Sequence, residues 1–242
     1  TTLSDGVATL EQMAGAAMDL DWEFLGIADH SQILNIGGSQ IGAMAEDMLA
    51  QGEQIRALNE TWVDGGKDFR IFHGAECDIL ADGSLDYDDE TRSALTHVVA
   101  SVHQLASWRN RDELENTENL IRAIEDPTCT ILGHPTGRIL QGRDGFPVDL
   151  HAVLRRMGEL NAEGELKSVE INASPYRLDL DWRFCRFARE QGVPVCINPD
   201  AHDIRGLRDV WFGVQMARKG WLRPEDLLNC RSGSELENQF FN

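Results

Sequence analysis

Strand-like and helix-like segments alternate along almost the whole chain, and this alternation restricts the possible folds more than any other feature. The expected strands are short apolar runs at 24–28, 69–76, 97–102, 129–133, 168–172 and 193–198. Strands separated by helices form right-handed βαβ units, and these build a parallel sheet. Six such strands in one domain of this size favour an α/β barrel over an open sheet.

Apolar residues at helical spacing mark the segments between the strands. Thr9 and Gln12 have the spacing of a capping box for a helix over 9–19. Asp149 can cap a later helix, and a long helix with Met44 and Met48 on its core stripe is interrupted by Gly52. Further helices are expected at 112–124, 182–191 and 207–219. Residues 233–242 are expected to form a loosely held C-terminal tail.

The composition limits the class of protein. The chain has 242 residues, 42% of them hydrophobic, which suits a single domain over 1–242. A net charge of −19 disfavours unaided binding to nucleic acid, because phosphate attraction needs a basic face. There is no apolar run long enough to span a membrane, and no membrane partner is expected. The five cysteines form no C-x-x-C pair, which predicts buried free thiols in a cytoplasmic protein.

Polar side chains occur at the C-terminal end of each expected strand. They are Asp29, His30, Glu76, Asp78, His103, His134, Asn172, Asp200 and His202. In α/β barrels these strand ends meet at one rim, where sites are assembled. One histidine at a strand end is usually a hydrogen-bonding residue without further function. The shared position of four histidines and several carboxylates predicts a common site.

Imidazole and carboxylate groups without thiolates suit Zn²⁺, Mn²⁺ or Fe²⁺. The number of ligands suggests two or three ions, with Glu76 able to bridge two of them. Such ions could hydrolyse phosphate esters by activating water and neutralising phosphoryl charge. Arg138 and Arg177, just beyond strand ends, are candidates to bind the phosphate, although either could be an ordinary surface or salt-bridging arginine.

The remaining histidines and Cys77 have simpler interpretations. His73 lies inside a strand and is expected to pack or hydrogen-bond in the core, while His97 and His151 are expected to be structural or solvated. Cys77 follows Glu76 directly, so strand alternation points it to the opposite face. None of these residues is expected to bind metal.

The order of motifs resembles the PHP superfamily, named for polymerase and histidinol phosphatase, and in particular the C-terminal PHP domain of bacterial family X DNA polymerases. The resemblance runs over nearly the whole chain. It is carried by SDG (4–6), ADH (28–30), GAECDILADGSLDY (74–87), ASVH (100–103), LGHPTGR (132–138), EINASPYRLDL (170–180) and INPDAH (197–202). It implies a distorted (β/α)7 barrel that holds up to three metal ions at its rim.

The resemblance also implies roles for individual residues. One ion is expected at Glu76, His103 and His134, and Glu76 would bridge to a second ion that Asp200 also binds. A third ion is expected at the set formed by Asp5, His30 and His202. Arg138 and Arg177 would bind the substrate phosphate, and the expected catalytic set is Glu76, His134 and Asp200.

The chain departs from the family pattern at its start. In the family, a strand ending in His-x-His-Thr directly precedes the segment matched by TTLSDG, and this chain begins at Thr1. Either the chain is a fragment of a longer protein, cut just inside the motif, or the protein lacks the two histidines. We favour the fragment, which leaves the barrel one strand short. Without the two histidines, only Glu76 and Asp200 remain for the second ion.

Three functions follow from these observations. The first is a metal-dependent phosphoesterase acting at DNA 3′ ends, as 3′–5′ exonuclease or 3′-phosphatase. A polymerase module would then supply the basic surface that binds DNA. The second is a small-molecule phosphomonoesterase similar to histidinol phosphatases, which the acidic charge fits equally well. The third is a metal-binding module without catalysis.

Overall fold

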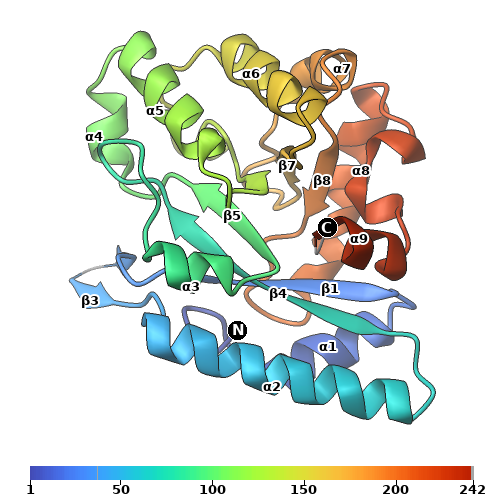
Figure 1. The fold of residues 1–242 in the computed structure, drawn as a ribbon. Helices are drawn as coiled ribbons and strands as arrows, with labels where there is room; N and C mark the ends of the chain where they lie inside the picture. The colour runs from blue at the N-terminus through green and yellow to red at the C-terminus, as the bar shows by residue number, and fades with distance from the viewer. Residues whose placement is uncertain (37, 241–242) are drawn as a thin grey trace.

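The computed structural model describes residues 1–36 and 38–240 and is built on one six-stranded parallel sheet (Figure 1). The strands lie side by side in chain order, as β1 (Phe24–His30), β4 (Arg70–Asp78), β5 (His97–Ser101), β6 (Ile131–Leu132), β7 (Ser168–Asn172) and β8 (Val195–Asn198). All six expected strands are therefore present. Because each strand pairs in parallel with the next one along the chain, their carboxyl ends meet at one edge.

Helices pack around the curled sheet, most of them on its outer face. They are α1 (Leu10–Met18), α2 (Ala45–Asp64), α3 (Asp89–Ser93), α4 (Leu105–Arg109), α5 (Glu113–Glu125), α6 (Leu150–Ala162), α7 (Trp182–Glu190), α8 (Val210–Lys219) and α9 (Gly233–Phe240). Figure 1 shows α5 to α8 in an arc outside β5 to β8, with α1 and α2 beside β1 and β4. A small hairpin, β2 (Asn35–Ile36) with β3 (Ser39–Gln40), precedes α2.

Local sequence signals set several helix starts. The Thr9–Gln12 capping box is present at α1, and the Asp149 side chain accepts hydrogen bonds from the first turn of α6. The predicted core residues of α6, which are Leu150, Val153, Leu154 and Met157, are all buried. These two predictions are confirmed.

The helix α2 begins later than its apolar stripe suggested. Its first residue is Ala45, and Met44 is 44% exposed, whereas Met48 is fully buried as expected. The segment before Met44 is tied to the end of β1, because the Ala43 N–H donates to the carbonyl of His30. Close packing explains the glycine at position 52, since a Cβ there would lie 2.8 Å from Nδ1 of His73.

The C-terminal residues differ from the expected loose tail. Residues Gly233–Phe240 form α9, and Leu236 is buried against an apolar cluster on the inner face of the sheet, with Phe72 and Ile131 among its members. The expectation was wrong because the burial of Leu236 depends on contacts with distant strands. The few apolar residues of this segment do not reveal such contacts. Residues 241 and 242 lie outside the described residues.

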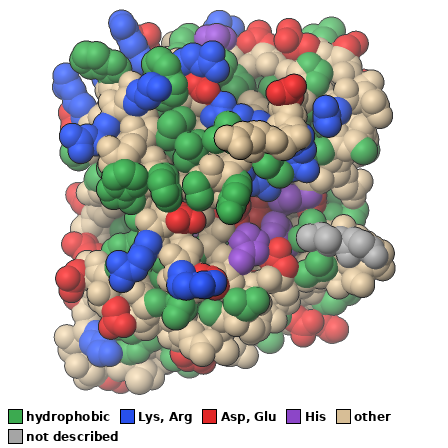
Figure 2. All heavy atoms as spheres, turned by 180° about the vertical axis from the view of Figure 1, so that it is seen from behind, with side chains coloured by type: hydrophobic (Ala, Val, Ile, Leu, Met, Phe, Trp, Pro, Cys, Tyr) green, Lys and Arg blue, Asp and Glu red, His purple; other side chains and the backbone are tan. Residues whose placement is uncertain are grey.

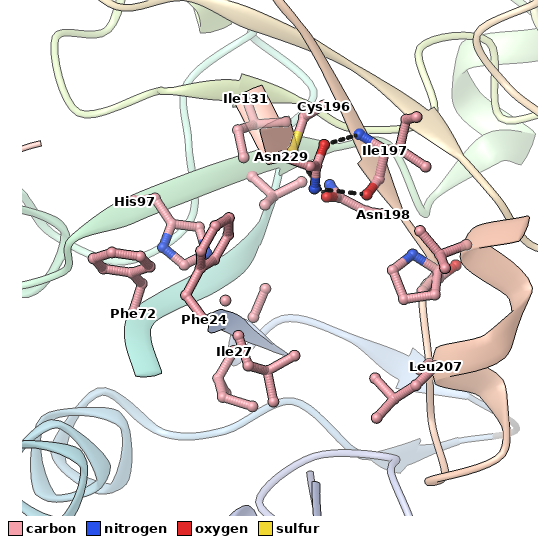
Figure 3. Close-up of a pocket in the computed structure, with 18 of the residues that line it drawn as sticks. Phe24, Ile27, Phe72, His97, Ile131, Cys196, Ile197, Asn198, Leu207 and Asn229 are labelled. Atoms are coloured by element: carbon pink, nitrogen blue, oxygen red, sulfur yellow. Dashed lines mark hydrogen bonds between the residues drawn. The ribbon is translucent and has the colours of Figure 1, made fainter. Parts of the chain in front are cut away.

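A cavity of about 760 Å³ lies on the inner face of the sheet (Figure 3). Its lower part is lined by apolar side chains such as Phe24, Ile27 and Leu207, and its polar end by ionisable side chains that include Glu76 and His202. Asn229 covers the open edge of β8, since its amide bonds both the N–H and the carbonyl of Ile197. The candidate site therefore stands at one end of a mostly apolar interior.

Four cysteines are buried free thiols, as expected, and Cys230 is exposed. Among the helices of the described residues, none combines the length and apolar character needed to cross a membrane.

His73 and His97 should make folding stability depend on pH. Burial lowers the pKa of each to about 4 from the ordinary 6.5. Between these values the unfolded chain binds a proton that the folded chain does not, so stability is complete above pH 6.5 and falls toward pH 4. The loss is about 3 kcal/mol per histidine.

Urea unfolding between pH 4 and 7.5 checks this expectation. His73→Gln should flatten the pH dependence of the unfolding free energy. His151→Gln, at a side chain that is 56% exposed, is the matched control and should leave it unchanged. An equal slope in both variants would show that His73 is not a source of the acid sensitivity.

Candidate metal centre

The centre of the site is the carboxylate of Glu76, which three histidine rings surround. Its Oε1 lies 2.9 Å from Nε2 of His134 and 3.2 Å from Nε2 of His103, and its Oε2 lies 3.5 Å from Nδ1 of His30. All of these side chains are buried or nearly so. Sheet register explains the arrangement, because His30 on β1 stands directly beside Glu76 on β4.

A second group adjoins the first. The Oδ2 atom of Asp5 lies 3.1 Å from Nε2 of His202 and 3.7 Å from Nε2 of His30. Residues near Asp5 are held in place by the Ser4 hydroxyl, which donates to Asp29, and by the Val7 N–H, which donates to the carbonyl of His202. His30 thus belongs to both groups, with one ring nitrogen facing Glu76 and the other facing Asp5.

Asp200 lies at the same rim but in neither group. Its Oδ2 accepts a hydrogen bond from the Asn172 amide at 2.9 Å and lies 3.6 Å from Nε of Arg177. The resemblance implied Asp200 and Glu76 as shared ligands of one ion. The two potential metal-ligand groups found among the described residues are Asp5, His30 and His202, and His30, Glu76 and His103.

The electrostatics of the two groups fit a cation. Burial would raise the pKa of Glu76, but His30 and His103 hold it well below its usual value. Burial would lower the pKa of His103, yet Glu76 and Asp78 raise it to about 10. The hydrogen bond that His202 donates to the Asp5 carboxylate is the main cause that raises the pKa of His202 to about 9. Without a cation, protons on imidazole balance the carboxylates, and a divalent ion can take their place.

The donor atoms also fit the expected metals. Imidazole nitrogens and carboxylate oxygens converge without a thiolate, a set that suits Zn²⁺, Mn²⁺ or Fe²⁺. Cys77, the nearest thiol in sequence, is buried in the core cluster behind the sheet, as strand alternation predicted. Potential ligand atoms within each group lie within 4.8 Å of one another.

Two buried carboxylates support the ligands from behind, and the sequence did not assign them this role. Asp78 lies 3.2 Å from Nδ1 of His103, so that ring stands between Asp78 and Glu76. Glu170 accepts a hydrogen bond from the backbone N–H of His134 at 2.6 Å and another from the Asn198 amide at 2.9 Å. Burial raises the pKa of Glu170 to about 7. Alternation in β7, which places Glu170 on the face of Asn172, is the signal that could have found it.

The two candidate phosphate-binding arginines differ in their surroundings. The Arg138 guanidinium bonds the carbonyls of Arg177 and Leu178 and pairs with Asp181 at 2.7 Å. It therefore ties together the loop that carries Arg177. Arg177 itself reaches the rim beside Asp200, and its buried Nη1 has no hydrogen-bond partner among the described residues.

Comparison with known proteins places the chain. No protein-family model matches it. It is 37% identical over 237 residues to a Bacillus subtilis protein named DNA polymerase/3′-5′ exonuclease PolX, which covers 98% of this chain. A probable phosphatase of Clostridium acetobutylicum is 26% identical over 174 residues, covering 68% of each chain. These matches confirm the expected resemblance to PHP-domain phosphoesterases. The chain spans 39% of the length of the Bacillus protein.

Solved structures show the same fold. The histidinol phosphate phosphatase of Lactococcus lactis, solved with zinc, L-histidinol and phosphate, matches with a TM-score of 0.61 at 12% identity, over 92% of both chains. A putative histidinol phosphatase of Listeria monocytogenes matches with a TM-score of 0.59 at 15% identity, over 86% of this chain and 94% of its own. The expected distorted α/β barrel fold is therefore confirmed.

Asp78 offers a test of the support behind the ligands. Asp78→Asn removes the charge that orients the His103 ring, so divalent-cation affinity should fall about 10- to 100-fold. Competition with a chromogenic chelator measures the affinity. Asp82→Asn, at an exposed position of the following loop, is the control and should bind divalent cations with the affinity of the unmodified protein. Equal affinity in both variants would remove Asp78 from the support of the site.

Proposed function

We propose that this PHP chain is a divalent-metal-dependent phosphoesterase that hydrolyses phosphate esters at DNA 3′ ends. The observation that carries the proposal is the pair of ligand groups joined by His30, with Arg177 at the same rim. The similarity to the Bacillus protein over 98% of the chain supports the DNA end as substrate. The chain's activity would then be that of a catalytic module with DNA presented from elsewhere, since its own net charge is −19.

Each side chain has a role in this proposal. Glu76, His103 and His134 would hold one ion, and Asp5, His30 and His202 would hold another, while Asp200 completes the rim. The ring of His30 lies between the two groups and as a neutral imidazole can ligate only one of the ions. When bound, the ions supply a water of lowered pKa and neutralise charge on the phosphoryl oxygens. Arg177, which lies beside Asp200 at the rim, binds the phosphoryl group, and Arg138 keeps the Arg177 loop in place.

Asp200 is placed where it can orient a neighbouring side chain or transfer a proton. It is less buried than Glu76 and contacts Arg177, so it can orient that guanidinium toward substrate. We therefore keep Glu76, His134 and Asp200 as the catalytic set.

A second candidate is a small-molecule phosphomonoesterase. The observation that favours it is the fold likeness to two histidinol phosphatases over 86% and 92% of the chain. An acidic surface suits a small substrate that needs no extended basic face. Metal binding without turnover is the third possibility.

One experiment separates these functions. The protein, expressed at its full gene-encoded length and loaded with Mn²⁺, should release phosphate from a 3′-phosphorylated oligonucleotide. Chelation of the metal should abolish this activity and lower the melting temperature, because bound ions stabilise the folded state. Turnover of histidinol phosphate but not of DNA would favour the second candidate, and bound metal without either turnover the third.

His134→Ala tests the ligand assignment. The variant should lose metal content and at least about 10²-fold in activity, because it removes the ring nearest to Glu76. The matched control is His151→Ala, at an exposed histidine of α6. Unchanged metal content and activity in His134→Ala would place this residue outside the site.

A further inference from the structure

Three arginines lie on segments that follow β5, β6 and β7, at the edge of the sheet where the metal centre lies. Arg109 ends α4 after β5, Arg143 lies in the loop from β6 to α6, and Arg177 lies in the loop from β7 to α7. Figure 2 shows Lys and Arg side chains gathered above the histidines in a hollowed part of this face. The chain has 41 acidic and 22 basic residues, so this local excess of positive charge is a reversal of its overall balance.

Contacts between the loops hold these arginines near one another. Nε of Arg143 donates to the carbonyl of Gly137 at 3.2 Å. Gly137 packs directly on α4, because a Cβ there would lie 2.6 Å from Cδ2 of Leu105. Burial lowers the pKa of Arg143, and the nearby charges of Arg177 and Arg109 lower it further.

The positive charge of this group is only partly balanced. Within the described residues, neither Arg109 nor Arg143 forms an ion pair with a carboxylate, and Arg177 approaches Asp200 no closer than 3.6 Å. Like charges held together without a counter-charge repel one another, so the arrangement favours an anionic ligand. Three segments that follow neighbouring strands thus carry guanidinium groups on the side of the sheet where the metal centre lies.

An exposed aromatic ring adjoins the arginines. Tyr176 precedes Arg177 and is 72% exposed, and its carbonyl accepts a hydrogen bond from the Leu140 N–H at 2.7 Å. This bond joins the Tyr176 loop to the turn that carries Arg143, which is closed by paired backbone bonds between Ile139 and Arg143. Arginine beside an exposed aromatic ring is the combination that binds single-stranded nucleic acid, through phosphate and base respectively.

We propose that Arg109, Arg143 and Tyr176 form a subsite for the nucleotides that adjoin the scissile ester, so that the site prefers a single-stranded polynucleotide end to a small phosphate monoester. The arginines bind the backbone phosphates, and the phenol ring stacks on a base. This inference rests on the proposed function. It names the residues through which the site would distinguish a long substrate from a short one.

Two substrates with the same scissile group test the subsite. The full-length, Mn²⁺-loaded protein is assayed on a 3′-phosphorylated oligonucleotide and on a nucleoside 3′-phosphate, and the ratio of their kcat/KM values is compared between variants. Arg143→Gln and Tyr176→Ala should each lower the ratio about tenfold, in the range expected for a lost stacking or phosphate contact. Binding of a fluorescent oligonucleotide, measured by anisotropy, should weaken in parallel and show a smaller salt dependence in Arg143→Gln.

Conservative variants separate ligand binding from loop structure. Arg143→Lys keeps the charge and Tyr176→Phe keeps the ring. The ratio of kcat/KM values in both variants should therefore stay close to that of the unmodified protein. Arg155→Ala removes an exposed arginine from α6 and should leave the ratio unchanged. Failure of the conservative variants to restore the ratio would assign the effect to the loops and overturn the subsite.

The remaining outcomes distinguish the two proposals. If all variants hydrolyse both substrates with the same ratio of kcat/KM values, the subsite is overturned. The phosphoesterase function at DNA ends would remain intact. Hydrolysis of the monoester without hydrolysis or binding of the oligonucleotide would overturn both. If neither substrate is hydrolysed, oligonucleotide binding that is equal in all variants would also reject the subsite.

Discussion

The buried carboxylate of Glu76 is the constraint on which the rest of the site depends. A charged carboxylate is costly to bury without partners, and here three imidazole rings lie between 2.9 and 3.5 Å from its oxygens. The rings come from β1 and from the segments that follow β5 and β6, so the parallel register of the sheet brings them together. A shift of one residue in β4 would point Glu76 away from the interior and leave the histidines without their shared partner.

Further carboxylates and amides form a layer beneath the ligands. Glu170 holds the backbone of His134, Asp78 faces the far side of the His103 ring, and Asn172 holds Asp200. Most of these groups lie on inward positions of strands whose outward positions, such as Val169 and Ile171 of β7, pack in the helix-facing core. One strand therefore contributes to packing with one face and to the site with the other.

Charge is distributed unevenly around the mouth of the barrel. Acidic side chains lie at the floor, where they and the histidines can hold cations, and arginines from three loops lie at the rim. This order suits a phosphate ester, whose charged oxygens would lie between the bound cations and the guanidinium groups. It also reconciles a net charge of −19 with an anionic substrate, because the local field at the rim differs from that of the whole surface.

The sequence alone determined the order of strands and the residues at their ends. Apolar runs separated by helical periodicity define βαβ units, and such units allow few topologies, so the position of Glu76, His103 and His134 at one rim could be predicted without coordinates. Local signals such as Thr9 with Gln12 were equally readable, because a cap depends on residues only three positions apart.

Only the tertiary structure decided which of these side chains meet. It joined His30 to both ligand groups, placed Asp200 beside Arg177 and outside both groups, and assigned Arg138 to the loop that carries Arg177. It also formed α9 where a loose tail was expected, since the burial of Leu236 depends on residues of β4, β5, β6 and β8. The physical reason is the same in each case. Contacts between distant segments depend on side-chain direction and loop packing, which the local sequence does not fix.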